Sequence, residues 1–64
     1  MPRITIEWFN TRTDEQRREV ARRITEVMVD VGGAKLETVI IRFDEYEPRF
    51  AARGGVMASD AANK

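Results

Sequence analysis

The chain has 64 residues, of which 42% are hydrophobic and 34% are charged, and its formal net charge is zero. Zero net charge argues against a nucleic-acid-binding protein, because such proteins gain affinity by neutralising phosphates. The absence of Cys and His excludes disulfides and argues against a zinc site. No apolar run approaches the roughly 20 residues that span a bilayer. Glu7 and Arg12 interrupt any stretch that resembles a signal peptide, so we expect a cytoplasmic protein without membrane contact.

A chain this short is expected to be marginally stable alone. It buries only about 60% of the surface that its unfolded form exposes. Small domains usually compensate with disulfides, a metal or oligomerisation, and the composition leaves oligomerisation. We therefore expect one domain, residues 1–64, that associates with itself.

The first expected element is a strand over residues 4–8, where apolar and polar side chains alternate. Ile4, Ile6 and Trp8 share one side of this strand, and Pro2 falls on the same side. A proline is tolerated at the start of a strand, where its missing N–H interrupts no central hydrogen bond. Residues 10–12 have turn character and carry Arg12.

The second expected element is a helix from about residue 14 to residue 31. Thr13 and Gln16 fit a capping box at its start, and Gly32-Gly33 ends it. The stripe expected to pack on the sheet comprises Val20, Ala21, Ile24, Val27, Met28 and Val31. Arginines on the other side alternate with acids at i,i+3 and i,i+4 spacing, which indicates a salt-bridged solvent face rather than a basic patch. Val29 is the apolar exception on that face and is expected to touch a neighbouring subunit.

The third expected element is a strand over residues 38–43, which is apolar almost throughout. Such a run suggests a central strand covered on both faces and paired in parallel through a helical crossover. Residues 44–48 are polar and turn-prone, and residues 50–57 around Gly54-Gly55 are expected to form a hairpin that covers a neighbouring chain. The fold class is therefore α/β (α+β): a small β-α-β unit plus a C-terminal hairpin, in an oligomer.

The usual catalytic groups are absent, since there is no Ser/His pair, no thiol, no P-loop and no metal cluster. We accordingly expect no metal and no other cofactor. A carboxylate site is an alternative, although acids in loops are usually just solvated; its candidates are Glu7, Asp44, Glu45 and Glu47. Tyr46 is better interpreted as a packing residue or a surface phenol.

Pro2 together with arginine is the remaining source of chemistry. Removal of Met1 would leave a free secondary amine, and an α-amino group has an ordinary pKa of about 8. Burial and nearby arginine charge both lower such a pKa, toward the range that a general base needs. Arginine would bind a substrate carboxylate through two parallel hydrogen bonds. Retention of Met1 would instead make the Pro2 nitrogen a tertiary amide without basicity.

These features together resemble the 4-oxalocrotonate tautomerase family. The resemblance rests on Met1-Pro2 followed by a strand, on the Arg-Thr-Asp-Glu-Gln segment of residues 12–16, and on the Phe50, Gly54-Gly55 and Ala58-Ser59 region. It extends from Pro2 to about Ser59. It implies the tautomerase fold, in which β-α-β units pair into four-stranded sheets and assemble as a hexamer. It also implies cofactor-free proton transfer between the enol and ketone forms of 2-oxo acids, in aromatic catabolism.

The resemblance also implies roles for individual residues. Pro2 would be the catalytic acid and base, Arg12 would bind the far carboxylate of a dicarboxylate substrate, and Phe50 would form the aromatic wall of the pocket. One extra residue separates Phe50 from the glycine pair, relative to the family pattern. Position 9 is Phe, where dehalogenase relatives carry an arginine in one subunit, so Phe9 argues against haloacrylate hydration.

The second active-site arginine of the family is missing, because the aligned position is Ile40. Arg42 lies two residues later on the same strand face, where it either replaces that arginine or forms an ordinary interface ion pair. Two functions remain open at this point. The first is a tautomerase acting on a small 2-oxo or enol acid, and the second is a non-catalytic or partner-dependent subunit of a hetero-oligomer with the same fold. A third reading, a nucleic-acid-binding helix, conflicts with the charge balance.

Overall fold

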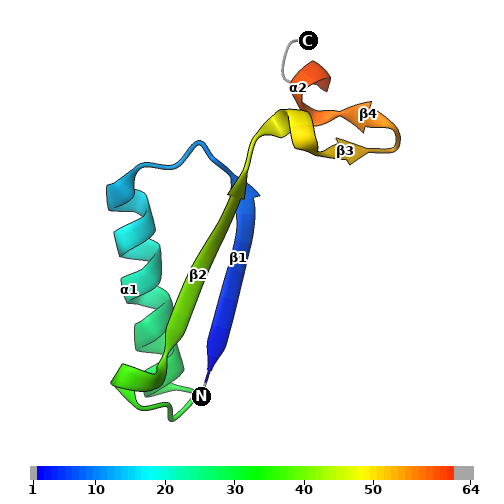
Figure 1. The fold of residues 1–64 in the computed structure, drawn as a ribbon. Helices are drawn as coiled ribbons and strands as arrows, with labels where there is room; N and C mark the ends of the chain where they lie inside the picture. The colour runs from blue at the N-terminus through cyan, green and yellow to red at the C-terminus, as the bar shows by residue number, and fades with distance from the viewer. Residues whose placement is uncertain (1, 62–64) are drawn as a thin grey trace.

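The computed structural model describes residues 2–61; Met1 and residues 62–64 lie outside the described part of the chain. A long helix and two parallel strands form the first two thirds of the fold, and a small hairpin follows (Figure 1). The elements in chain order are β1 (Arg3–Phe9), α1 (Asp14–Asp30), η1 (Leu36–Thr38), β2 (Ile40–Tyr46), η2 (Pro48–Phe50), β3 (Ala52–Arg53), β4 (Val56–Met57) and α2 (Ala58–Ala61).

The strands β1 and β2 pair in parallel, from Arg3 opposite Ile40 to Phe9 opposite Tyr46. Parallel neighbours need a crossover connection, and α1 provides it. The strands β3 and β4 form a separate antiparallel pair, joined by glycines with φ values of +57° and +83° that other residues rarely adopt. The predicted β-α-β unit followed by a C-terminal hairpin is thus confirmed, and it matches the tautomerase fold.

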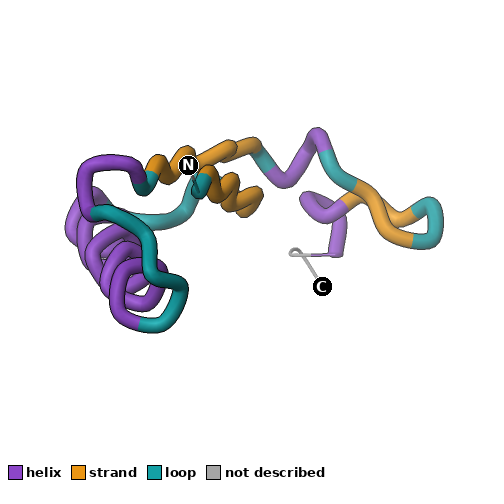
Figure 2. Tube along the Cα trace, turned by 90° about the horizontal axis from the view of Figure 1, so that it is seen from below, coloured by secondary structure: helices purple, strands orange, loops and turns teal. Residues whose placement is uncertain are grey.

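The two faces of the β1–β2 pair differ in composition, because side chains alternate along each strand. The face beneath α1 carries the register pairs Ile4–Ile41, Ile6–Phe43 and Trp8–Glu45. Figure 2 shows α1 against this face and the hairpin extending away from α1. The opposite face has no covering element among residues 2–61, and most of its side chains are exposed: Arg3, Thr5, Glu7, Ile40 and Arg42.

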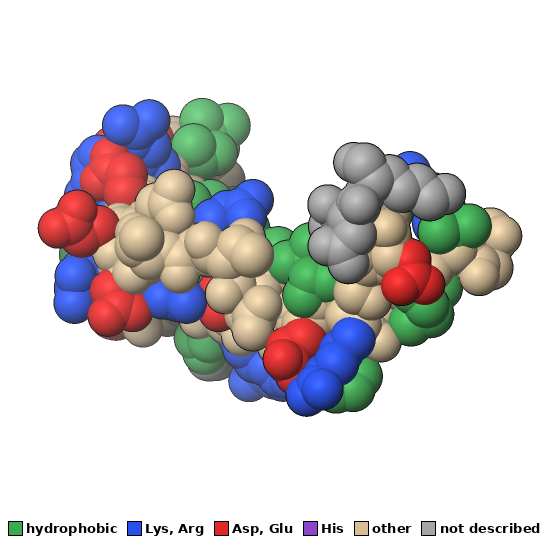
Figure 3. Space-filling model, turned by 90° about the horizontal axis from the view of Figure 1, so that it is seen from above, with side chains coloured by type: hydrophobic (Ala, Val, Ile, Leu, Met, Phe, Trp, Pro, Cys, Tyr) green, Lys and Arg blue, Asp and Glu red, His purple; other side chains and the backbone are tan. Residues whose placement is uncertain are grey.

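The start of α1 has the expected capping box. The Thr13 hydroxyl accepts a hydrogen bond from the Gln16 backbone N–H at 3.1 Å, and the Gln16 side chain accepts one from the Thr13 N–H at 2.9 Å. The helix ends at Asp30, with Val31 as its C-cap. The salt-bridged face is also confirmed: Glu19 accepts from Arg22 and Arg23, each at 2.6 Å. Figure 3 shows acidic and basic side chains intermixed on the surface over α1.

The expected apolar stripe of α1 is only partly correct. Val20, Ala21, Ile24 and Met28 are partly buried, as predicted, whereas Val27 is 57% exposed and Val31 83% exposed. Val31 lies beyond the last helical turn, and the sheet below is only two strands wide. A narrow sheet cannot cover the full arc of the stripe, so these side chains remain at its edge.

The predicted bounds of the second strand are wrong at both ends. Residues 38 and 39 do not belong to β2, because Leu36–Thr38 form a 3₁₀ turn in which the Val39 N–H bonds the Leu36 carbonyl. At the other end β2 continues to Tyr46, through residues that were expected to form a turn. The Phe9 ring meets the Tyr46 ring edge-on at a centroid distance of 5.1 Å, and this contact holds the last residues of β2 in the strand.

The expectation that the second strand is central and covered on both faces is also wrong for the single chain. In residues 2–61, β2 pairs only with β1, and one face of the pair is bare. No side chain of the described residues is fully buried. The accessible surface is 5202 Å², whereas a compact monomer of this mass exposes about 4,200 Å². The radius of gyration is 15.2 Å, against about 11 Å for a compact domain of this length.

The stability of the fold should therefore depend on protein concentration. A chain without a closed core gains stability from association, and mass action makes that gain larger as concentration rises. We expect the midpoint of thermal unfolding to rise by several degrees between micromolar and near-millimolar protein, as measured by circular dichroism. A midpoint independent of concentration would show that the isolated chain is stable by itself.

Candidate functional site

Pro2 lies directly before β1 and is half-buried. Its carbonyl oxygen accepts a hydrogen bond from the Ile40 N–H at 3.0 Å, which joins the head of β1 to the head of β2. The missing N–H of proline costs no hydrogen bond at this position. The backbone at Pro2 is thus fixed by the sheet through Ile40, the position where the sequence lacks the expected arginine. In the register Ile40 lies opposite Arg3, on the face of the sheet that α1 does not cover.

Arg12 lies at the other end of β1, in the loop that leads into α1, and its side chain is exposed. Its guanidinium carbon is 4.6 Å from the centre of the Trp8 ring, a cation–π contact. One N–H donates to the Thr11 hydroxyl at 3.0 Å. Arg12 forms no ion pair with an acid of residues 2–61. Its remaining N–H groups are therefore available to a carboxylate.

A polar network lies beside Arg12, and its centre is Glu45. Arg17 donates two parallel hydrogen bonds to the Glu45 carboxylate at 2.8 and 2.9 Å, and the Trp8 indole N–H donates a third at 2.6 Å. Arg17 also donates to Asp14 at 2.7 Å. The hydrogen bonds from Arg17 and Trp8 hold the pKa of the Glu45 carboxyl below its ordinary value. Glu45 is therefore a fixed anion of the fold rather than a solvated loop acid.

This network was not predicted from the sequence. The sequence pattern predicts a turn at Glu45 and places Arg17 on the solvent face of the helix. Glu45 lies 37 residues from Trp8 and 28 from Arg17, so no local spacing connects them. The one available signal is the parallel register, which places position 45 opposite Trp8 once the alignment of the two strands is known.

The other two candidate residues occupy exposed positions. Arg42 lies on the bare face of β2, as Ile40 does, and its nearest acid is Asp44 at 3.8 Å. Phe50 ends η2 and is 69% exposed, with the Arg49 guanidinium 5.1 Å from its ring centre. Within residues 2–61, Phe50 lines neither the hollow beside the hairpin nor the one beside α1. The nearby hollow of about 550 Å³ is instead walled by Phe9, Tyr46, Ala51, Ala52, Arg53, Val56, Ala58 and Ala61.

The structure separates the predicted site residues into two groups. Pro2 and Ile40 lie at the amino ends of the parallel strands, whereas Arg12 and Phe50 follow their carboxyl ends (Figure 1). β1 has 7 residues, which span roughly 23 Å at about 3.3 Å per residue. A small organic acid cannot touch Pro2 and Arg12 of the same chain. A site that uses both residues must combine two chains.

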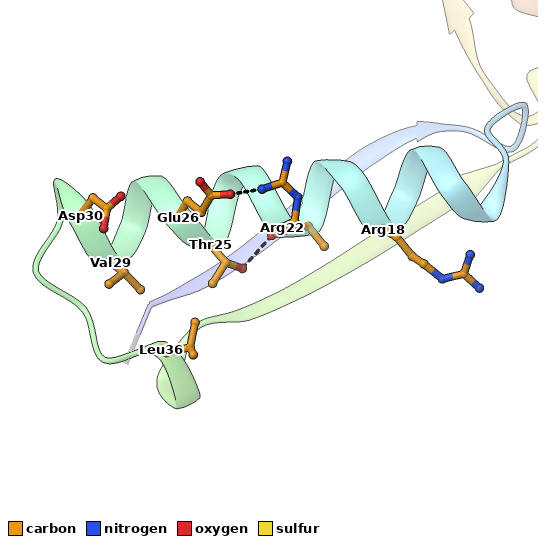
Figure 4. A pocket seen from close by; sticks show the side chains of 8 residues that line it. Arg18, Arg22, Thr25, Glu26, Val29, Asp30 and Leu36 are labelled. Atoms are coloured by element: carbon orange, nitrogen blue, oxygen red, sulfur yellow. Dashed lines mark hydrogen bonds and ion pairs between the residues drawn. The ribbon is translucent and has the colours of Figure 1, made fainter.

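A second hollow lies alongside α1, where the helix faces η1 (Figure 4). Its volume is about 590 Å³, and Val29 and Leu36 supply its apolar walls. Three of its polar side chains are engaged within the helix: Arg22 pairs with Glu26, and the Thr25 hydroxyl donates to the Ala21 carbonyl at 2.7 Å. Arg18 and Asp30 complete its polar lining. It contains neither Pro2 nor Arg12, so it carries none of the expected chemistry. The expected contact of Val29 with a neighbouring subunit stays a prediction.

Two further findings concern the described residues as a whole. Residues 2–61 contain no group of three His, Cys, Asp or Glu side chains arranged to hold a metal ion. Neither helix in that range is long and apolar enough to cross a membrane.

Comparison with known proteins agrees with this architecture. Residues 2–61 match the family described as tautomerase enzyme. The chain is 32% identical to the 2-hydroxymuconate tautomerase of Bacillus subtilis over 60 residues, which cover 94% of this chain and 97% of the relative. The crystal structure of a 4-oxalocrotonate tautomerase homologue superposes with a TM-score of 0.88 at 32% identity, covering 94% and 95% of the two chains.

The chain therefore belongs to the tautomerase family, as a homologue of 4-oxalocrotonate tautomerase. A more distant structure shares the fold: a heterohexamer 4-oxalocrotonate tautomerase from Chloroflexus aurantiacus. It has a TM-score of 0.85 at 23% identity, covering 94% of this chain and 97% of that one. The resemblance inferred from the sequence is confirmed.

The Glu45 network should make the fold sensitive to acid. Because the folded-state pKa of Glu45 lies below its ordinary value of 4.5, its contribution to stability is present above about pH 4.5 and is lost as pH falls through the lowered pKa. Glu45→Gln should lower the unfolding midpoint at neutral pH and flatten its decline between pH 5 and about pH 3, at fixed protein concentration.

Glu19 gives a separate acid response, because its hydrogen bonds from Arg22 and Arg23 lower its pKa to about 2. Its contribution is lost as pH falls from about 4.5 to about 2, which overlaps the range measured, so the decline that Glu19 causes remains in Glu45→Gln. Glu37→Gln is the matched control, since the Glu37 side chain is exposed and forms no ion pair with the described residues. An equal change in both variants would mean that Glu45 has no special part in acid stability.

Proposed function

We propose that this chain is a cofactor-independent tautomerase that interconverts the enol and keto forms of a small 2-oxo mono- or dicarboxylic acid. Pro2, freed by removal of Met1, is its general acid and base, and Arg12 binds a substrate carboxylate. The observation that carries the proposal is the family match over residues 2–61, which begins at Pro2 itself. The curated relative from Bacillus subtilis is named for tautomerisation of 2-hydroxymuconate, an enol acid of this class.

The position of Pro2 suits this role. Its carbonyl is held by Ile40, so a free amine at Pro2 would have a defined place at the head of the sheet. The neutral secondary amine removes the proton from the enol oxygen and becomes a cation. It then delivers a proton to carbon, which forms the ketone and restores the neutral amine. An amine with an ordinary pKa of about 8 needs little adjustment to work in both directions near neutrality.

The active site in this proposal is shared between chains. Pro2 of one chain meets Arg12 of another, because the two residues lie at opposite ends of β1. The bare face of the sheet and the absence of a fully buried side chain support association. The hairpin, with Phe50 and Val56 exposed by 69% and 49%, is a candidate cover for a neighbouring chain, where Phe50 would form the aromatic wall. We propose a hexamer as the assembly.

Arg42 is the candidate for the second polar contact with substrate. It lies on the same strand face as Ile40, two residues further from Pro2, and its ion pair with Asp44 is long at 3.8 Å. It would polarise the carbonyl or bind a second carboxylate. The competing role, an ion pair at an interface between chains, fits the same exposed position. Substitution of Arg42 separates the two roles, as described below.

A second function is favoured by one specific observation, the apolar Ile40 at the position of the missing arginine. The chain would then be a non-catalytic or partner-dependent subunit of a mixed assembly. A 4-oxalocrotonate tautomerase with the same fold is a heterohexamer, so such assemblies exist. In this case the active sites would need a second chain that supplies an arginine near Pro2.

Pro2→Ala tests the proposed mechanism. The ring-held secondary amine is replaced by an unconstrained primary amine, and we expect turnover of an enol acid to fall by about a hundredfold, a typical contribution of general acid–base catalysis. Intact mass must first show that Met1 is absent, since a retained Met1 turns the Pro2 nitrogen into an amide. Arg23→Ala is the control, because Arg23 is exposed and pairs only with Glu19 within the described residues. Unchanged turnover in Pro2→Ala, with the assembly intact, would exclude the mechanism.

Ile40→Arg tests the substrate class. Restoring a guanidinium at the head of β2 should raise kcat/KM for 2-hydroxymuconate by about tenfold, because a charge-assisted hydrogen bond to the second carboxylate becomes possible in a site shared between chains. Turnover of an enol acid with one carboxylate should change little, and Ile40→Leu should alter neither substrate. If Arg42 already performs this task, Arg42→Ala will selectively impair the dicarboxylate and Ile40→Arg will add little. The absence of any turnover without a second purified chain would favour the mixed assembly.

A further inference from the structure

Trp8 offers a contact that the proposed mechanism does not use. The Arg12 guanidinium lies over the face of its ring at 4.6 Å. A guanidinium held over a ring face makes no hydrogen bond to the ring atoms, so its N–H groups stay available for the two-pronged contact that a carboxylate forms. The loop that carries Arg12 contributes only one other side-chain contact to it, from Thr11 at 3.0 Å. Within the described residues, the Trp8 ring is thus the main surface that defines where the guanidinium lies.

The Trp8 ring is itself fixed on two sides. It stacks on Phe43 at a centroid distance of 5.3 Å with the ring planes 19° apart. Its indole N–H donates to the Glu45 carboxylate at 2.6 Å, so rotation of the ring would break a charge-assisted hydrogen bond. A fixed ring can hold a cation in one place, whereas a mobile ring would only follow it.

Glu45 is held in turn by α1. Its two oxygens accept parallel hydrogen bonds from Arg17, whose third contact is with Asp14 in the first helical turn. The side chains of Glu45 and Arg17 are only 17% and 27% exposed. A continuous set of contacts therefore connects the start of α1 with Trp8 and, through Trp8, with Arg12. Of the charged side chains in this set, Arg12 alone has no acidic partner among residues 2–61.

We propose that Trp8 is a positioning residue for carboxylate binding: it holds the Arg12 guanidinium with its N–H edge toward substrate, and Glu45 and Arg17 fix Trp8. The inference rests on the proposed role of Arg12. Trp8 does not touch substrate; it acts through Arg12 alone. Its removal consequently weakens substrate binding but has no effect once Arg12 is gone.

A double-mutant cycle of Trp8→Leu and Arg12→Ala tests this dependence, with KM and kcat measured on 2-hydroxymuconate. Trp8→Leu should raise KM about three- to tenfold, as loss of a cation–π contact implies, and leave kcat within about twofold. Trp8→Phe should recover most of the KM, because a ring face remains. In the Arg12→Ala background, Trp8→Leu should cause no further rise. An equal rise in both backgrounds, or a loss confined to kcat, would overturn the proposal.

Two measures keep the test decisive. If Trp8→Leu fails to fold, Glu45→Gln replaces it in the cycle, because it weakens the contacts that fix the ring. Its expected KM rise is about two- to threefold, again only when Arg12 is present. Arg23→Ala is the matched control for loss of an exposed arginine and should leave KM unchanged.

Trp8 is the only tryptophan in the sequence, so its fluorescence reports the contact without any catalysis. Arg12→Ala should shift the Trp8 emission of the free protein, and Arg23→Ala should not. Titration with cis,cis-muconate, which lacks the enol hydroxyl, should change the emission of the native protein but not that of Arg12→Ala. Emission insensitive to Arg12 would overturn the proposal.

The two kinds of failure are distinguishable. If the native protein turns over no enol acid while Arg12 still governs both the Trp8 emission and its response to muconate, the proposed function fails and the positioning contact stands. If the native protein is active but Trp8→Leu and Arg12→Ala act independently, the positioning role fails and the proposed function stands.

Discussion

The parallel pairing of β1 and β2 is the constraint on which the rest of the structure depends. Parallel neighbours need a long crossover, and α1 takes up 17 of the chain's 64 residues to provide it. One helix covers one face of a two-stranded sheet, which leaves the other face and both strand edges uncovered among residues 2–61. The same pairing brings both carboxyl ends to one edge, so the loop with Arg12 and the segment with Phe50 lie at the end opposite Pro2.

At the carboxyl ends of β1 and β2, one acid, Glu45, accepts the hydrogen bonds that fix the neighbouring polar side chains. Glu45 engages Arg17 and the Trp8 indole, so its negative charge is used within the fold. Arg12 has no acid of its own among residues 2–61 and instead lies over an aromatic ring. A carboxylate partner would have competed with an acidic substrate, whereas a ring holds the cation and leaves its hydrogen-bonding edge open. The neutral overall composition thus conceals a cation that an aromatic ring holds in a position suited to bind an anion.

Features set by neighbouring residues could be predicted from the sequence. The Thr13 capping box, the alternation along β1 and the glycine turn of the hairpin all follow local rules and are present. Features set by distant contacts could not: β2 runs to Tyr46 because that residue packs on Phe9 and its neighbour Glu45 is bonded from β1 and α1. Of the candidate site, Pro2 and Arg12 were available from the family resemblance. The contact between Arg12 and Trp8 depends on the path of a loop, which no spacing encodes.

The separation of Pro2 from Arg12 has a consequence for how such proteins evolve. In the proposed site the proton-transfer group and the anion-binding group come from different copies of a chain, so selection would act on each end of β1 separately. After gene duplication, one copy can lose the proton-transfer group and the other copy can lose the anion-binding group. A mixed pair of the two copies then still contains one complete site. Division of labour between paralogues is therefore open to this architecture without any change of fold, and Ile40, whose N–H bonds the Pro2 carbonyl, lies at a position where such divergence can begin.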